Sequence, residues 1–197
     1  MRLWLFSLLL CFSLAGCDAR KSTVKFHGMP INQADFGRDF LLNDPTGQPR
    51  RLRDFRGKAV VIFFGYTQCP DVCPTTLSTM AEVMHLLGED AKRVQVLFVT
   101  LDPARDTRDL LKNYVPRFHP SFIGLSGDEA ATAAVAREFR VYYLKHPGSP
   151  EVPGSYSLDH TANSYLFDPQ GRLRLAEKQG ENAEAIAADL RLLLAER

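Results

Sequence analysis

Three short apolar runs divide the middle of the chain. The run 59–64 contains no polar residue, as expected for a central strand covered on both faces, and the runs 94–101 and 122–125 also have strand length. Pro74 can occupy the first position of a helix between the first two runs. The apolar residues after it recur at spacings of three and four, which predicts one apolar helix face: Leu77, Met80, Met84 and Leu87.

Weaker signals extend this alternation on both sides. Residues 40–42 and 50–52 flank a turn sequence and predict a hairpin. Asp106 or Thr107 can cap a further helix that includes Leu110. The remaining predictions are helices over 128–139 and 183–194, strands over 141–144, 156–158, 164–167 and 172–176, and a Gly/Pro-rich loop over 147–153.

Strands that alternate with helices, followed by a hairpin and a last helix, indicate a mixed α/β sheet. The order matches a thioredoxin-like fold with extra N-terminal strands and an insertion before the final β-hairpin. The chain has 197 residues, of which 45% are hydrophobic, so it can bury one substantial core. We assign residues 34–197 to this single domain.

The N-terminus has a different character. Arg2 precedes an apolar run over 3–15, which is short for a bilayer span and typical of a secretory signal. The run ends in Leu-Ala-Gly-Cys, which resembles a bacterial lipobox, so we expect residues 1–16 to be a lipoprotein signal peptide and Cys17 to be lipid-modified. Asp18 resembles an inner-membrane retention signal. Residues 17–33 are polar and are predicted to tether the domain to the membrane.

Charge and cysteine content narrow the function classes. The chain has 24 basic and 23 acidic side chains, so no overall field favours binding to nucleic acid. Of the four cysteines, Cys11 leaves with the signal and Cys17 carries the lipid, which leaves Cys69 and Cys73 as thiols. A pair of thiols in an oxidising compartment is a structural disulfide, a redox centre or a metal site.

Cys69 and Cys73 lie in a loop that joins a buried strand to a helix N-terminus. Free backbone N–H groups and the helix dipole favour anions there, so we expect a stabilised thiolate. Thioredoxin-type redox pairs are separated by two residues, whereas this pair is separated by three. The longer loop allows both sulfurs to converge on one ion, and soft thiolates select Cu(I) or Zn over hard cations.

A tight site needs a third ligand, and five histidines could provide it. Four of them read as residues of the tether, a helix surface or solvated loops: His27, His85, His119 and His146. His160 stands immediately before the penultimate strand, in a loop that faces the cysteine loop in a thioredoxin fold. It could instead be a loop histidine bonded to Asp159, and spacing alone does not decide between the two.

A resemblance to a known family adds to this reading. The segments 69–74, 101–107 and 159–161 are similar to signatures of the Sco/SenC family, in the same order and at matching separations. The similarity spans about residue 36 to the C-terminus. It implies an extracytoplasmic, membrane-anchored thioredoxin-fold protein that binds a copper ion through Cys69, Cys73 and His160 and helps to assemble the dinuclear copper site of cytochrome c oxidase. Many members use a transmembrane anchor, whereas this chain has a predicted lipid anchor.

Two functions remain open on these grounds. One is a copper metallochaperone on the periplasmic face of the bacterial inner membrane, with the copper-site subunit of cytochrome c oxidase and a thiol reductant protein as partners. The other is a thiol–disulfide reductase that keeps the oxidase copper-site cysteines reduced, which would use Cys69 and Cys73 as redox residues. A peroxiredoxin-type peroxidase fits poorly, because Thr67 has the wrong spacing to Cys69.

Polar residues of the same motifs have simpler structural interpretations. We expect Asp102, Arg105 and Asp106 to form a proline turn, a salt bridge and a helix cap. Asp71, between the cysteines, is expected to shape the loop, with partner binding as the alternative.

Overall fold

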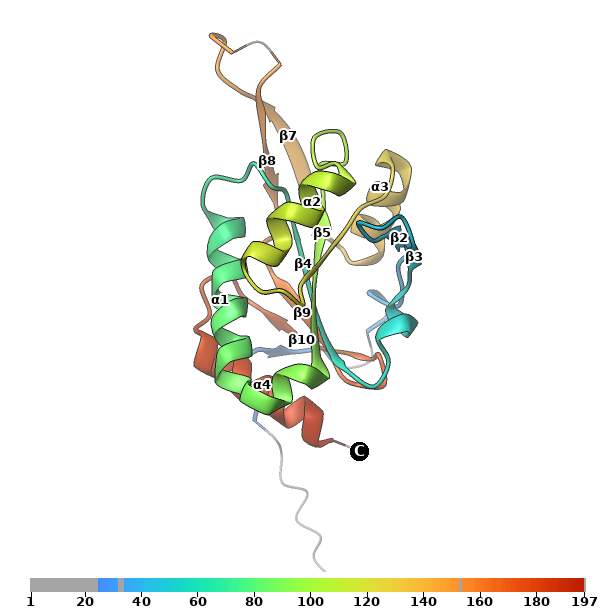
Figure 1. Cartoon of the computed structure of the whole chain (residues 1–197), viewed down its shortest axis with the longest axis vertical. Helices are drawn as coiled ribbons and strands as arrows, with labels where there is room; N and C mark the ends of the chain where they lie inside the picture. The colour runs from blue at the N-terminus through green and yellow to red at the C-terminus, as the bar shows by residue number, and fades with distance from the viewer. Residues whose placement is uncertain (1–24, 32–33, 153, 197) are drawn as a thin grey trace, which may run out of the picture.

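The computed structural model describes residues 25–31, 34–152 and 154–196, and its centre is a mixed sheet (Figure 1). The strand order is β1-β10-β9-β4-β5-β6. Strands β4, β5 and β6 are parallel, and the other neighbours are antiparallel. The bounds are β1 Met29–Pro30, β4 Ala59–Gly65, β5 Val94–Thr100, β6 Ile123–Leu125, β9 Ser164–Phe167 and β10 Leu173–Glu177.

Helices and two separate hairpins complete the domain. The α-helices are α1 Val72–Leu87, α2 Arg108–Tyr114, α3 Glu129–Glu138 and α4 Ala183–Ala195. The 3₁₀ helices are η1 Leu52–Phe55, η2 Gly88–Arg93 and η3 Val115–Arg117. The hairpins pair β2 Leu42–Asn43 with β3 Pro49–Arg50, and β7 Tyr143–Pro147 with β8 Tyr156–His160. None of the helices within the described residues has the length and apolar character that a membrane crossing requires.

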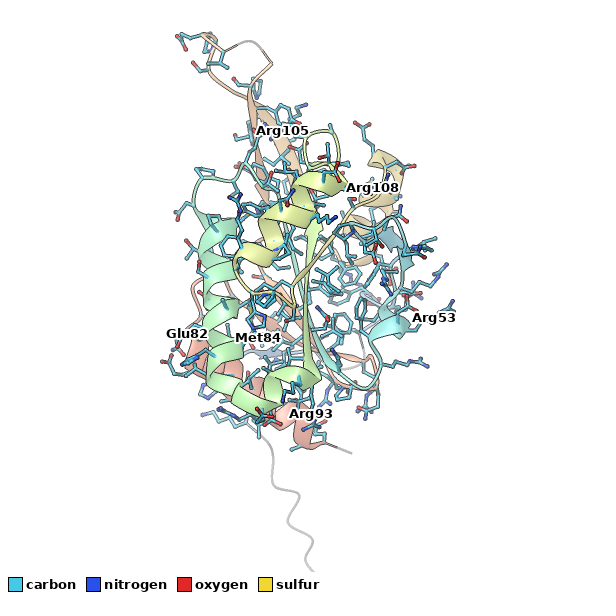
Figure 2. All side chains as sticks on the ribbon, viewed as in Figure 1. Arg53, Glu82, Met84, Arg93, Arg105 and Arg108 are labelled. Carbon is cyan, nitrogen blue, oxygen red and sulfur yellow. The ribbon has the colours of Figure 1, made fainter. Side chains whose placement is uncertain are left out.

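Helices cover both faces of the sheet, which explains the unbroken apolar run of β4. Gly65 faces the start of α1, and Gly124 on β6 faces α2 from the same side of the sheet. Helix α4 packs against α1. Phe64 points to the opposite face, where its ring lies 5.2 Å from that of Phe139 at the end of α3. All seven residues of β4 are therefore buried, and Figure 2 shows side chains filling the space between the sheet and the helices.

This arrangement confirms the predicted fold class. Strand β4, helix α1 and strand β5, followed by the β9–β10 hairpin and α4, form the thioredoxin-like unit. Strands β1 to β3 precede it, and the β7–β8 hairpin is the predicted insertion before the final hairpin.

Several boundaries differ from the predictions, each for a local reason. Helix α1 begins at Val72, so Pro74 is its third residue rather than its first, still within the turn whose N–H groups have no intrahelical partner. The first predicted hairpin is shorter than expected, because residues 52–55 turn into η1, where the Asp54 carboxylate accepts from the Arg51 N–H at 2.8 Å. Strand β7 extends to Pro147, so the prediction of a loop at His146 was wrong.

The boundary between tether and domain also differs. Residues 25–31 fall within the predicted tether, yet β1 pairs with β10 at the edge of the main sheet. The backbone N–H groups of His27 and Gly28 donate to the buried carboxylate of Asp189 on α4, at 2.8 to 3.0 Å. Backbone pairing needs no apolar pattern, which is why composition suggested a linker here. Residues 1–24, including the predicted signal peptide and Cys17, lie outside the described residues.

Candidate metal centre

The cysteine loop begins where β4 ends, at Gly65, a position where the surrounding atoms leave no space for a side chain. A Cβ atom on Gly65 would lie 2.7 Å from Cys73 Sγ, so glycine allows the sulfur to approach the end of the strand. The Cys73 N–H donates to Cys69 Sγ at 3.4 Å. Both cysteines are free thiols; Cys73 is fully buried and Cys69 is half-buried.

Hydrogen bonds to the side chain of Asp106 hold the start of the same loop in place. Its carboxylate accepts from the N–H and the hydroxyl of Thr67, at 3.0 and 2.5 Å, and from the hydroxyl of Thr100 at 2.6 Å. Burial raises the pKa of the Asp106 carboxyl group. Of the two predicted caps of α2, Thr107 is confirmed, since its hydroxyl accepts from Leu110 N at 3.2 Å, and the capping role expected of Asp106 was wrong. The role of Asp106 could have been inferred, since parallel neighbours β4 and β5 end at one sheet edge.

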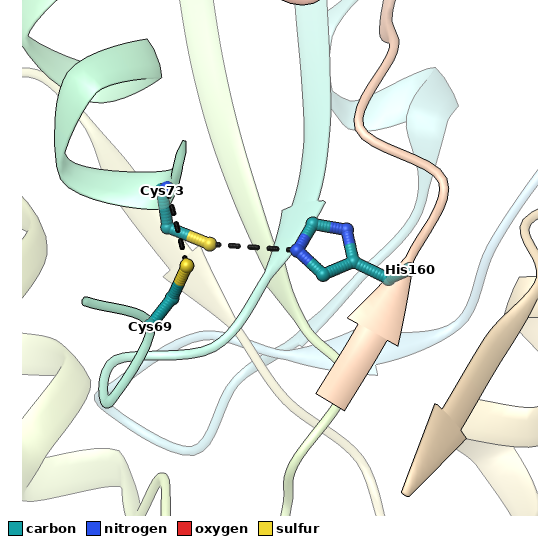
Figure 3. A group of neighbouring side chains, drawn as sticks. All are labelled: Cys69, Cys73 and His160. Atoms are coloured by element: carbon teal, nitrogen blue, oxygen red, sulfur yellow. Dashed lines mark hydrogen bonds between the residues drawn. The ribbon is translucent and has the colours of Figure 1, made fainter. Parts of the chain in front are cut away.

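His160 is the last residue of β8 and faces the cysteines (Figure 3). Its Nε2 lies 3.6 Å from Cys73 Sγ. Its Nδ1 lies 3.0 Å from the Thr161 carbonyl oxygen, which only accepts, so Nδ1 carries the proton and Nε2 keeps its lone pair. The rings of Phe63 and Tyr66 meet the imidazole edge-on, with centroids 6.2 and 6.1 Å away. The tautomer and the orientation therefore suit metal binding.

The alternative for His160, a loop histidine bonded to Asp159, does not hold. Asp159 instead contacts His146 on the paired strand, with Oδ2 2.9 Å from Nε2. The other histidines lie away from the cysteines: His85 is exposed on α1, His119 contacts Ser121, and His27 contacts Asp189 through its backbone.

The three side chains form one compact group of donors. The sulfurs of Cys69 and Cys73 and a ring nitrogen of His160 all lie within 4.8 Å of one another, and no other such group of histidine, cysteine and acidic residues occurs in the described part of the chain. Cys69 and His160 line a cavity of about 350 Å³, together with Tyr66, Pro70 and Leu158. The donor set is two sulfurs and one imidazole nitrogen, which fits a soft ion such as Cu(I).

Burial changes the expected acid–base chemistry of Cys73. Desolvation raises the pKa of this thiol, and the negative charge of Cys69 adds to the effect. The expectation of a stabilised thiolate is therefore not met at Cys73, because removal from water raises the pKa of its thiol. A bound cation would restore the preference for the thiolate, so metal binding at this site is coupled to the release of a proton.

Asp71 is exposed at the N-terminal end of α1, on the rim of the same cavity. Its carboxylate accepts from the Thr75 hydroxyl at 3.3 Å, a local contact that agrees with a role in shaping the loop.

Fold and site together define a class: a thioredoxin-like protein with a two-cysteine loop that faces a histidine, suited to a soft metal ion. Comparison with known families assigns the chain further. The SCO1/SenC family model matches residues 28–195, and the chain belongs to this family. The match begins at residue 28, ahead of the expected start near residue 36, in agreement with β1 as part of the domain.

Relatives of known structure carry the same fold. ScoI of Bradyrhizobium japonicum, solved with copper bound, is 42% identical with a TM-score of 0.73, and the match covers 81% of this chain and 99% of that one. Apo Sco1 of Thermus thermophilus is 39% identical with a TM-score of 0.77, over 87% and 99% of the two chains. A SCO2-like protein of Rickettsia felis is 40% identical over 136 residues, which are 69% of this chain and 66% of that relative's length.

Proposed function

We propose that this protein binds one copper ion through Cys69, Cys73 and His160 and delivers it to the copper-site subunit of cytochrome c oxidase during assembly of its dinuclear copper site. ScoI of Bradyrhizobium japonicum and yeast Sco1 have structures with copper bound. The Sco family is described as one of cytochrome c oxidase assembly proteins. The observation that carries the proposal is the 3.6 Å approach of His160 Nε2, with its free lone pair, to Cys73 Sγ.

The site suits an ion that must arrive and leave. Cys73 and the ring of Phe63 are fully buried and exclude water on the inner side, whereas Cys69 and His160 line the cavity. A partner's ligands can therefore approach the ion from the cavity side and replace Cys69 and His160 in turn. Copper is the cargo in this account, and Cys73 gives up its thiol proton when the ion binds.

A thiol–disulfide reductase is the second candidate, favoured by the unequal exposure of the two cysteines. The half-buried Cys69 thiolate would attack a partner disulfide and release one partner thiol. The Cys73 thiol would then give up its proton to the departing partner thiolate as its sulfur attacks the Cys69 sulfur and releases the second partner thiol, so two electrons pass to the partner and a Cys69–Cys73 disulfide remains. A thiol reductant protein would restore both thiols.

His160→Ala separates the two functions, because it removes a metal ligand and leaves both thiols. Delivery of copper predicts that oxidase assembly under copper limitation fails as it does for Cys69→Ala. Reductase action predicts substantial remaining oxidase activity. His85→Ala is the matched control, since His85 is exposed on α1 away from the cysteines. Normal oxidase activity in the His160→Ala strain would contradict the delivery of copper and leave the reductase as the better account.

We further propose that the mature protein is attached to the periplasmic face of the bacterial inner membrane by lipid on Cys17. The support is the apolar segment 3–15 that ends in Leu-Ala-Gly-Cys. Cys17→Ser should block lipid labelling and normal processing of the precursor. Mass spectrometry that finds an unmodified Cys17 in the mature protein would contradict this proposal.

A further inference from the structure

The hairpin that carries His160 pairs with no strand of the main sheet in the described part of the chain. Strands β7 and β8 form their own two-stranded sheet, outside the six-stranded sheet, and project beyond the body of the domain in Figure 1. The cysteines, in contrast, lie between β4 and α1 of the main fold. In the described residues no backbone hydrogen bond joins β8 to the cysteine loop, and β8 reaches the main sheet through residues 161–163, which lead into β9 beside β4. Side-chain contacts between β8 and the cysteine loop therefore help to set the separation of Cys73 and His160.

Arg105 makes contacts to both ligand-bearing segments. Its Nη1 donates to Gln68 Oε1 at 3.1 Å and to the Tyr156 carbonyl oxygen at 2.9 Å. Gln68 precedes the ligand Cys69, and Tyr156 is the first residue of β8. One guanidinium group therefore links the cysteine loop to the strand of His160, and Figure 2 shows Arg105 beside this hairpin.

The guanidinium group is itself held in one orientation. Its Nε donates to the Asp102 carboxylate, whose other oxygen accepts from the Tyr156 hydroxyl at 2.6 Å. The guanidinium carbon lies 3.4 Å from the centre of the Tyr156 ring, and Lys145 Nζ on β7 lies 3.5 Å from the same centre. Asp102 is buried, and the Arg105 side chain is 18% exposed, so these charge-assisted bonds are largely shielded from water.

We propose that Arg105 is a positioning residue for the copper site: it holds the β7–β8 hairpin against the cysteine loop and so keeps His160 within reach of Cys73. The inference rests on the proposed copper binding. Lysine cannot replace arginine here, because the bridge needs a planar group with several donors in fixed directions. The salt bridge predicted for this motif is present, with Asp102 as the partner of Arg105, and it is one of several contacts that hold the hairpin.

A double-mutant cycle tests the proposal through Cu(I) affinity, measured by competition with bathocuproine disulfonate. Arg105→Ala should lower the affinity about tenfold in the wild-type background and less than about twofold in the His160→Ala background, because the misplaced ligand is then already absent. Arg105→Lys should behave like Arg105→Ala. Arg137→Ala, which removes an exposed arginine on α3, should leave the affinity unchanged. An equal loss from Arg105→Ala in both backgrounds would overturn the proposal.

A second variant and a spectroscopic measurement test the same positioning role of Arg105. Tyr156→Phe removes only the hydroxyl that holds Asp102, so it should weaken binding about threefold, again only when His160 is present; it replaces the Arg105 variants in the cycle if they do not fold. X-ray absorption of the Cu(I)-loaded Arg105→Ala protein should show less nitrogen scattering than wild type, and an unchanged signal would contradict the proposal. If the reduced wild-type protein binds no copper, the proposed function fails; if it binds copper and the cycle is additive, only this inference fails.

Discussion

Gly65→Ala should damage the copper site, because the added methyl group would press against the sulfur of Cys73. The added Cβ would lie 2.7 Å from Cys73 Sγ, 3.0 Å from a ring carbon of Phe98 and 3.1 Å from a ring carbon of Phe63. Ordinary contacts to a Cβ begin near 3.4 Å, so the sulfur must retreat by about 3.4 − 2.7 = 0.7 Å. The two rings are close to the new Cβ as well, and Phe63, Phe98 and Cys73 are all fully buried, so the side chains around it cannot relax into open space.

Overpacking of this kind costs about 1–3 kcal/mol. We therefore expect urea unfolding of the reduced, metal-free protein to show a loss of that size. The Cu(I) affinity should fall as well, because a shift of about 0.7 Å moves Cys73 Sγ away from the position shared with Cys69 and His160.

Gly124→Ala on β6 is the matched control. Its Cβ would lie 3.0 Å from Leu111 Cβ and 3.1 Å from Val115 Cγ2, in a buried position that touches no metal ligand. This variant should lose stability and keep its copper affinity. The reasoning is refuted if Gly65→Ala retains the wild-type affinity, or if Gly124→Ala weakens copper binding as much as Gly65→Ala does.

Three further outcomes are expected. Asp106→Ala leaves Thr67 and the Thr100 hydroxyl without their shared acceptor, so it should cost about 2–4 kcal/mol in urea unfolding and lower the Cu(I) affinity; unchanged values of both would contradict the role of Asp106. Burial and the neighbouring Asp189 raise the pKa of Glu177, so the folded state holds the proton of this carboxyl group more tightly than the unfolded state does. The free energy of unfolding should therefore fall as pH rises from about 5 through the raised pKa, and Glu177→Gln should flatten this fall. A pH profile that this substitution leaves unchanged would contradict the assignment. Oxidation to a Cys69–Cys73 disulfide removes both sulfur ligands, so equilibrium dialysis of the oxidised protein should detect no bound copper, and treatment with a thiol reductant should restore loading; loading of the oxidised form would count against the site.

The elements that could be predicted from the sequence are those with a regular arrangement of apolar residues along the chain. Strand β4 is buried on both faces, so its apolar run has no interruption. Helix α1 buries one side, and the stripe Leu77, Met80, Met84 and Leu87 follows from that. Both signals are local, and they position the cysteine loop without any knowledge of the rest of the chain.

The parts that escaped prediction depend on contacts between distant residues. Strand β1 has two residues and no apolar pattern, and Asp189 on α4 holds the backbone that leads into it. In the β7–β8 hairpin, Asp159 contacts His146 on the opposite strand rather than its sequence neighbour His160. This contact depends on how the two strands are aligned, which spacing along the chain does not reveal. Spacing brought His160 forward as a candidate, and the family resemblance implied its role as a ligand. Neither signal contained its approach to Cys73.

The central claim is that three protein side chains form one copper site, and X-ray absorption on the reduced, Cu(I)-loaded protein tests it most directly. Together with metal analysis, the measurement should give one copper per chain, with sulfur neighbours from Cys69 and Cys73 and a nitrogen neighbour that disappears in His160→Ala. A wild-type spectrum with only oxygen or nitrogen neighbours, or one unchanged by His160→Ala, would contradict the account.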